Sequence, residues 1–312
     1  MARHLVTGGA GFIGSHIVDA LVARGDSVVV LDDLSTGKLA NLEQSRSRIE
    51  LIEADLRDLG AVRAACRGVN CVFHHAAIAS VPRSIEDPVA SNGVNASGTL
   101  NLLVAAREAG VRRVVYAASS SAYGDATRMP VSEDTRAAPL SPYAVSKHVG
   151  ELYCQVFWQL YRLETVVLRY FNVFGPRQDP ASEYAAVIPK FITALQRGQS
   201  PVIFGDGEQT RDFVYVANVV AANLLAGDAP AAPGQVVNIA GGARASLNEL
   251  VAAMQRVIGV ATPPVYTSPR PGDIVHSFAD ISRAGDVLGY RVAVPLDQGL
   301  ALTAEWFRAC LR

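Results

Sequence analysis

A tyrosine and a lysine four residues apart are the first side chains in this sequence that could carry out a reaction. Tyr143 and Lys147 follow Ser141-Pro142, a typical helix start, so they lie one turn apart on one helix face. A lysine ammonium favours the tyrosinate of a neighbouring tyrosine, whose ordinary pKa is about 10. The pair could therefore take a proton from a hydroxyl group. The alternative is a packing tyrosine followed by a solvent-facing lysine.

A run of serines lies 24 residues before Tyr143 and could join the same reaction. Ser119, Ser120 and Ser121 follow the apolar run 114–117. A hydroxyl at this strand end could hydrogen-bond the same substrate oxygen as Tyr143. The alternative is a serine-rich junction between a strand and a loop.

A glycine loop near the N-terminus has the spacing of a dinucleotide-binding site. Gly8, Gly11 and Gly14 lie between a short apolar run and a helical pattern, and a second strand-like run ends at Asp32. Such glycines allow a tight turn and close approach to a pyrophosphate, whose charge the helix N-terminus attracts. Asp32 could accept hydrogen bonds from a ribose diol and would repel a 2′-phosphate, which favours NAD over NADP.

Strand-like and helical patterns alternate along the first half of the chain. Apolar runs recur at 49–52, 71–73, 114–117 and 166–169, with helical patterns at 60–67, 95–109 and 143–162. This alternation predicts an α/β fold, a Rossmann-type doubly wound parallel sheet. Ligands bind at the carboxyl ends of such strands. The residues expected there are Gly8, Asp32, Asp55, Ala76, Ala77, Ser119, Tyr170 and Asn172.

The second half of the sequence has shorter segments and more turn signals. We therefore expect an NAD-binding Rossmann domain over residues 1–173, with a return strand near 236–240. A smaller mixed α/β domain that binds the substrate is expected over 174–312.

Composition narrows the class of protein. The 312 residues carry 28 basic and 29 acidic side chains, which gives no support for a nucleic-acid or anionic-membrane partner. No apolar stretch reaches membrane-spanning length and no signal-like segment precedes the first strand, so we expect a cytoplasmic protein. His74 and His75 lack further ligands at metal-binding spacing, which predicts a core role and no metal site. The cysteines without pairing signals, expected to be buried reduced thiols, are Cys66, Cys71, Cys154 and Cys310.

Together these features resemble the extended short-chain dehydrogenase/reductase family, and within it the UDP-hexose 4-epimerases. The resemblance covers essentially the whole chain. Its motifs are Thr7-Gly8-x-x-Gly11-x-x-Gly14, Asp32-Asp33-Leu34, Asp55-Leu56, Asn95-x-x-Gly98-Thr99, Ser119 to Gly124, Ser141-Pro142-Tyr143-x-x-x-Lys147, Leu168-Arg169-Tyr170-Phe171-Asn172, Arg211-Asp212-Phe213 and Arg270-x-Gly272-Asp273.

The resemblance implies roles for individual residues. Those implied to bind NAD are Gly8, Gly11, Phe12, Ile13, Gly14, Asp32, Asp33, Asp55, Leu56, Ala76, Ala77, Asn95, Tyr143, Lys147 and Tyr170. Those implied to bind the UDP-sugar are Ser119, Ser121, Tyr143, Asn172, Val187, Val202, Ile203, Phe204, Arg211, Arg270, Asp273 and Ser277. Ser119, Tyr143 and Lys147 would be catalytic. A homodimer through the helices at 95–109 and 143–162 is also implied.

Departures from related subfamilies indicate the reaction and the sugar. Dehydratases carry an Asp-Glu pair where this chain has Ser120 and Ser121, and galactose-type epimerases often carry a lysine at the place of Ala79. The segments 80–84 and 177–180 resemble bacterial epimerases of N-acetylated sugars. Epimerases restricted to glucose and galactose have a tyrosine at the place of Ser277, where serine leaves space for an acetamido group.

The sequence therefore predicts an isomerase that interconverts UDP-N-acetylglucosamine and UDP-N-acetylgalactosamine through a 4-keto intermediate. It predicts activity on UDP-glucose as well. A UDP-glucuronate 4-epimerase and a strict UDP-glucose 4-epimerase remain alternatives. An NAD-sensing protein without catalysis is a further alternative, but such a protein would be expected to lose the Tyr143–Lys147 pair.

Overall fold

The largest element of the fold is a seven-stranded parallel sheet. The computed structural model describes residues 2–180, 186–269 and 275–310. The strand order is β10-β6-β5-β4-β1-β2-β3, so the chain reverses direction across the sheet between β1 and β4. Ligands bind at such a switch point. The strands are β1 (Arg3–Thr7), β2 (Ser27–Asp32), β3 (Ile49–Glu53), β4 (Cys71–His74), β5 (Arg113–Ser119), β6 (Glu164–Tyr170) and β10 (Val236–Ile239).

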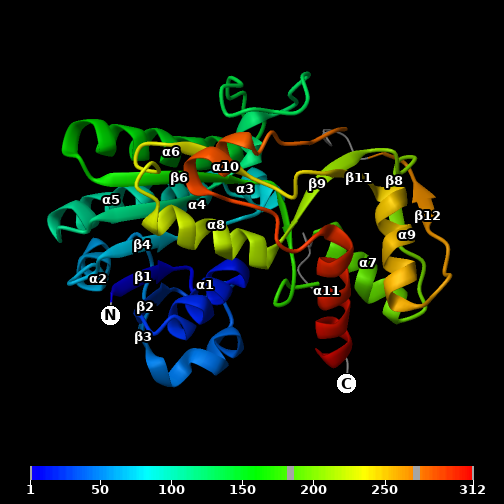
Figure 1. The fold of residues 1–312 in the computed structure, drawn as a ribbon, viewed down its shortest axis with the longest axis horizontal. Helices are drawn as coiled ribbons and strands as arrows, with labels where there is room; N and C mark the ends of the chain where they lie inside the picture. The colour runs from blue at the N-terminus through cyan, green and yellow to red at the C-terminus, as the bar shows by residue number, and fades with distance from the viewer. Residues whose placement is uncertain (1, 181–185, 270–274, 311–312) are drawn as a thin grey trace.

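Helices cover both faces of this sheet (Figure 1). One face carries α1 (Phe12–Ala23), α8 (Val216–Asp228) and α10 (Ser282–Leu288), and the other carries α2 (Leu59–Ala65), α5 (Thr99–Glu108) and α6 (Pro142–Tyr161). Along β1, Leu5 and Val6 belong to opposite hydrophobic clusters, as the alternation of side chains along a strand requires. Apolar residues at consecutive positions therefore build two cores, and the predicted doubly wound sheet is confirmed.

A smaller group of elements lies beside the large sheet, at the right of Figure 1. It has a three-stranded sheet of β7 (Asn172–Phe174), β9 (Thr210–Tyr215) and β11 (Arg244–Ser246), and a pair of strands, β8 (Val202–Phe204) and β12 (Val265–Thr267). Helices α7 (Val187–Gln196), α9 (Leu247–Ile258) and α11 (Leu296–Cys310) pack around a separate apolar cluster.

The chain passes between the two sheets at a short link. Tyr170 ends β6 in the large sheet, and Asn172 begins β7 in the smaller one. The later sequence returns to the large sheet with β10, which pairs in parallel with β6, and with α8 and α10 on one face. The division into two domains near residue 173 stays a prediction.

The helix expected over 95–109 has two parts. A π-helical segment, Gly93–Gly98, precedes α5. Asn95 points inward from this segment, where its Oδ1 accepts from the Ile78 N–H at 2.8 Å and its Nδ2 donates to Ser146 Oγ at 3.0 Å. A side chain at Gly98 would come within 2.8 Å of Leu56. The widened turn therefore brings the amide of Asn95 between the loop after β4 and α6.

The remaining short helices are Leu39–Arg48, α3 (Val81–Glu86), α4 (Pro88–Asn92) and Ser120–Tyr123.

One cysteine departs from its expected place. Cys66, Cys71 and Cys154 are buried free thiols, but Cys310 is exposed. It lies in the last turn of α11, so the expectation of a buried thiol is wrong there.

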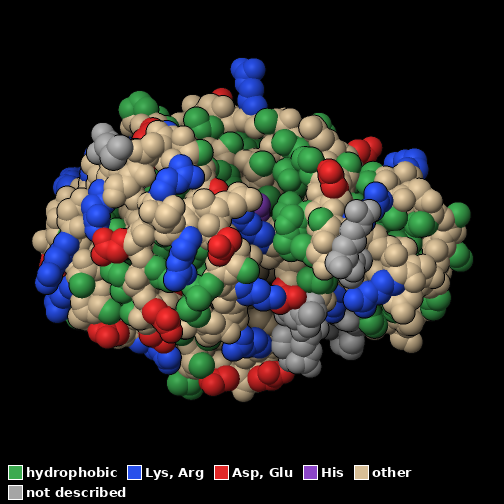
Figure 2. Space-filling model, turned by 90° about the horizontal axis from the view of Figure 1, so that it is seen from below, with side chains coloured by type: hydrophobic (Ala, Val, Ile, Leu, Met, Phe, Trp, Pro, Cys, Tyr) green, Lys and Arg blue, Asp and Glu red, His purple; other side chains and the backbone are tan. Residues whose placement is uncertain are grey.

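The surface carries charges of both signs. On the face seen in Figure 2, Lys and Arg side chains are interspersed with Asp and Glu. Within the described ranges, no helix is long and apolar enough to cross a membrane.

Candidate active site

The glycine loop after β1 is shaped for close approach of a ligand. Gly8 has φ +66°, and a Cβ there would lie 2.6 Å from the backbone nitrogen of Ala76. A Cβ at Gly14 would overlap the carbonyl oxygen of Gly8. Gly11 precedes α1 without a side-chain cap, so the first N–H groups of the helix face the loop. This cradle fits a dinucleotide pyrophosphate held against the helix N-terminus.

Asp32 lies beside this loop at the end of β2. Its carboxylate accepts from the N–H groups of Ala10 and Leu34, both at 2.9 Å, and burial raises its pKa. A carboxylate has about four acceptor sites, so two remain for a ribose diol. Among the described residues, the charged neighbour that affects Asp32 is the acid Asp33, and such an acidic site disfavours a 2′-phosphate, which fits NAD.

The other acids predicted at the adenosine end already have protein partners. Asp33 accepts from the backbone and hydroxyl of Ser35. The Arg57 guanidinium binds the Asp55 carboxylate at 2.6 Å and lowers its pKa. Arg57 was missed from the sequence, although it lies only two residues from Asp55. Leu56 is buried beside the π-helical segment.

Ser119 and Tyr143 meet at the carboxyl edge of the sheet, one from β5 and the other from the first turn of α6. Ser119 Oγ accepts from the Ser121 N–H at 3.2 Å and from the Ser121 hydroxyl at 2.9 Å. Its own hydrogen is thereby left for the Tyr143 oxygen, and this interaction lowers the Tyr143 pKa. This direction of donation stabilises a tyrosinate.

Lys147 lies one turn further along α6 and is 4% exposed. Its ammonium lies 4.4 Å from the centroid of the Tyr116 ring. Burial lowers the pKa of Lys147 to about 8, which the Glu151 carboxylate opposes. Burial also raises the pKa of Tyr143, and the Ser119 hydrogen bond lowers it in part.

The expected lowering of the Tyr143 pKa by Lys147 is therefore not seen in the protein alone. Burial removes water from both groups and disfavours the charged form of each. A tyrosinate at this position needs further positive charge, and the nicotinamide ring of a bound NAD⁺ carries such a charge.

Two residues predicted beside the cofactor have their polar groups engaged within the protein. The Asn95 amide hydrogen-bonds Ile78, in the loop after β4, and Ser146 on α6. The Tyr170 hydroxyl lies 3.0 Å from His75 Nε2 and 3.0 Å from Asn223 Oδ1. Ala76 and Ala77 follow β4, and Ala76 is the backbone that Gly8 approaches. The histidines here serve packing and hydrogen bonding, and the described residues hold no cluster suited to a metal ion.

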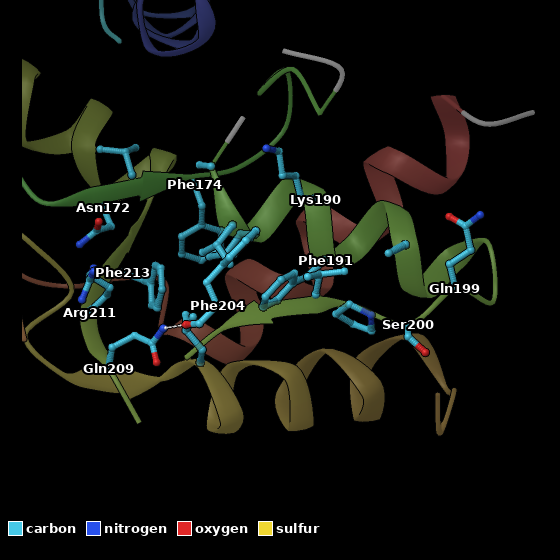
Figure 3. A pocket seen from close by; sticks show the side chains of 18 residues that line it. Asn172, Phe174, Lys190, Phe191, Gln199, Ser200, Phe204, Gln209, Arg211 and Phe213 are labelled. Carbon is cyan, nitrogen blue, oxygen red and sulfur yellow. Dashed lines mark hydrogen bonds between the residues drawn. The ribbon is translucent and has the colours of Figure 1, made fainter. Parts of the chain in front are cut away.

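A cavity of about 690 Å³ opens among β7, α7, β8 and β9 (Figure 3). Asn172 and Arg211 lie at one end, Gln199 and Ser200 lie at the other, and phenylalanines line the space between. The predicted substrate residues that line it are Asn172, Val187, Val202, Phe204 and Arg211.

Four other residues predicted to bind the substrate do not line this cavity in the described structure. Ile203 does not line the cavity; its side chain is fully buried in the core of the smaller group of elements. Arg270 and Asp273 lie outside the described residues. Ser277 is half-buried next to β9, where its N–H donates to the Thr210 carbonyl at 3.0 Å.

Several lining residues were missed from the sequence. Lys190 lies three residues after Val187 and so on the same face of α7. Gln209 Nε2 donates to the Phe204 carbonyl at 2.6 Å and lies two residues before Arg211. Both spacings could have indicated these residues. Gln199, Ser200 and Phe213 carried no comparable signal.

A glycine loop, an acid after β2 and a Ser-Tyr-Lys group at the edge of a parallel sheet define a dinucleotide-binding protein of the short-chain dehydrogenase type. The chain belongs to the NAD dependent epimerase/dehydratase family, whose model matches residues 4–240. NAD is accordingly its cofactor.

Named relatives align over nearly their full length. UDP-glucose 4-epimerase from Mycolicibacterium smegmatis is 44% identical over 98% of each chain. A UDP-N-acetylglucosamine 4-epimerase from Methanobrevibacter ruminantium M1, solved with UDP-N-acetylmuramic acid, is 41% identical with a TM-score of 0.95 over 99% of each chain. UDP-glucose 4-epimerase from Thermotoga maritima, solved with UDP-glucose, is 39% identical with a TM-score of 0.94, over 99% of this chain and all of that one.

Proposed function

We propose that this protein is a UDP-sugar 4-epimerase that interconverts UDP-N-acetylglucosamine and UDP-N-acetylgalactosamine, and also UDP-glucose and UDP-galactose. Epimerase relatives acting on both kinds of sugar support this proposal. The observation that carries the chemistry is the grouping of Ser119, which lowers the Tyr143 pKa, with Tyr143 and with the buried Lys147 one helical turn further on.

In the proposed reaction, Tyr143 takes the proton of the sugar O4 and later gives it back. Ser119 donates to the Tyr143 oxygen and so favours the deprotonated tyrosine. Lys147 would hold the nicotinamide ribose, and the positive nicotinamide ring would then favour the tyrosinate. When bound, NAD supplies the hydride chemistry, in which the C4 hydride is removed and then returned to the opposite face of the sugar. Asn172 and Arg211 would hold the diphosphate near the cavity.

The proposed sugar preference depends on Ser277. The hydrogen bond from Ser277 to Thr210 ties this residue to the start of β9, next to Arg211. A serine here occupies less space than a tyrosine, and a packed interior has no spare volume for the additional acetamido atoms. Ser277 therefore supports acceptance of N-acetylated sugars.

The direct test is to incubate purified protein with UDP-N-acetylglucosamine alone, without added NAD, and to follow UDP-N-acetylgalactosamine by NMR. Parallel reactions contain UDP-glucose and UDP-glucuronate. Tyr143→Phe is the matched control and should lower kcat by at least about 10²-fold with little change in UDP-sugar binding. Turnover of UDP-glucuronate alone would overturn the substrate assignment, and a near-normal rate in Tyr143→Phe would remove Tyr143 from the mechanism.

We also propose that the protein is a homodimer. The outer face of α6 carries large apolar side chains, and α3 and α4, which pack against α6, carry three more. These exposed residues are Val81, Ile85, Val89, Val145, Leu152, Val156 and Leu160. Such a stripe on neighbouring helices is typical of an interface. Light scattering should give a dimer that Leu152→Glu disrupts, whereas Leu302→Glu on α11 leaves it intact.

A further inference from the structure

The buried ammonium group of Lys147 needs a partner that stabilises its charge. The side chain is 4% exposed, and burial disfavours a charged amine. Within the described ranges, no hydrogen bond or ion pair to Lys147 Nζ is found; its contact is with the face of the Tyr116 ring. An aromatic face attracts a cation and offers no atom that could take its proton.

Tyr116 also holds the backbone of the same lysine. Its ring is fully buried on β5, and its hydroxyl donates to the Lys147 carbonyl at 3.1 Å. One residue therefore contacts Lys147 at both ends, with the ring under the ammonium and the hydroxyl on the main chain. These two contacts restrict both the position of α6 on the sheet and the direction of the lysine side chain.

Gly150 is explained by the same arrangement. It lies inside the 20-residue helix α6, where glycine costs about 1 kcal/mol relative to alanine. A Cβ at this position would overlap the Tyr116 hydroxyl. The glycine therefore leaves the space that the Tyr116 hydroxyl needs to reach α6.

A histidine held by hydrogen bonds lies next to the Tyr116 ring. Thr7 Oγ1 accepts from the N–H groups of His75 and Ala76, both at 3.2 Å, so its own hydrogen is left for His74 Nδ1 at 2.7 Å. His74 Nε2 then carries a hydrogen and donates to Thr99 Oγ1 at 2.9 Å. The His74 ring lies 5.5 Å from the Tyr116 ring. These bonds fix a neutral imidazole against Tyr116 and link it to the start of the glycine loop.

We propose that Tyr116 is a positioning residue for the reaction, which keeps the Lys147 ammonium charged and directed at the nicotinamide ribose. The inference rests on the proposed epimerase function for its consequence in catalysis. The contact between ring and ammonium can be tested without turnover.

Other titratable groups around Lys147 do not replace this support. Those near it are Tyr143, Glu151 and Cys154 on α6, His74 at the end of β4, His75 directly after it, and Tyr116 on β5. Burial lowers the pKa of both histidines and keeps them neutral, and it raises the pKa of the Cys154 thiol. The Glu151 carboxylate binds the Arg169 guanidinium at 2.8 and 3.0 Å and His148 at 2.8 Å. Much of its charge is thereby neutralised.

The small number of lysines makes a direct measurement practical. The chain has three, Lys38, Lys147 and Lys190, so protein labelled with ¹³C at the lysine Cε gives three signals, which Lys147→Arg assigns. The Lys147 pKa is measured in wild type, in Tyr116→Phe and in variants with one to three fluorines on a phenylalanine at 116. Fluorine weakens the negative face of the ring while nearly keeping its shape, so loss of folding does not confound the series.

Tyr116→Phe should keep the Lys147 pKa close to that of wild type, because the ring face is retained. The pKa should fall stepwise with fluorine number, by about 0.5 to 1.5 units in total, as expected for a buried cation–π contact. The alkaline limb of the pH dependence of kcat/KM should move down in the same order. An unchanged Lys147 pKa across the series would overturn the proposal. A stepwise fall in protein that turns over no UDP-sugar would instead uphold the contact and refute the epimerase function.

Discussion

Removal of the Ser119 hydroxyl should make Tyr143 a weaker acid and shift the pH dependence of the reaction. The two lone pairs of Ser119 Oγ are occupied by the N–H and hydroxyl of Ser121, so its hydrogen is left for Tyr143, whose pKa it lowers. In Ser119→Ala, nothing in the described site replaces this donor. Burial then raises the Tyr143 pKa without opposition.

The size of the shift follows from the strength of a hydrogen bond to a charged group. Such a bond contributes about 1.5–3 kcal/mol, which corresponds to a rise of about 1–2 units in the Tyr143 pKa. Below that pKa, the rate is proportional to the tyrosinate fraction, so kcat should fall by about 10- to 100-fold. Above the raised pKa the loss should become smaller.

The assay is kcat against pH with UDP-N-acetylglucosamine, for wild type, Ser119→Ala and Ser121→Ala. Ser121→Ala keeps the N–H donor to Ser119 and removes only the hydroxyl donor, so its acid limb should move much less. An acid limb at the same pH in wild type and Ser119→Ala would refute the reasoning. Equal shifts in the two variants would show that Ser119 acts by another route.

Four further predictions follow from single contacts. Gly14→Ala should purify with far less NAD than wild type, measured by absorbance after denaturation, because the new methyl group overlaps the Gly8 carbonyl. Ser277→Tyr should abolish turnover of N-acetylated sugars and spare UDP-glucose; a parallel loss of both activities would contradict its proposed role. Burial raises the pKa of Asp212 to about 7 from 3.8, so the unfolded chain releases this proton at lower pH than the folded one. Asp212 should therefore make the free energy of unfolding fall as the pH rises from about 4 to about 7. In thermal unfolding, Asp212→Asn should flatten that dependence. A thiol reagent should modify Cys310 rapidly in the native protein while the three buried thiols react only on unfolding.

The Tyr143–Lys147 pair and the glycine loop could be predicted from the sequence, because the geometry of each depends only on residues close together in the chain. The spacing of Tyr143 and Lys147 places them on one helix face in any helix, and the glycine loop requires only β1 and α1. The parallel sheet followed from apolar runs that are buried on both faces. The alternation of side chains along a strand could also have shown that Ile203 does not face the cavity. Val202 and Phe204 point to the cavity, and Ile203 points to the core.

Contacts between distant segments were decided by the tertiary structure alone. Ser119 reaches Tyr143 because β5 ends beside the first turn of α6, and Tyr116 lies under Lys147 for the same reason. Asp212 is buried where the chain brings the N–H groups of Gly241 and Ala279 to its carboxylate. The raised pKa of Tyr143 and the lowered pKa of Lys147 also result from the tertiary structure, because burial causes both shifts. Desolvation depends on everything packed around a group, whereas spacing along a helix fixes only its nearest neighbour.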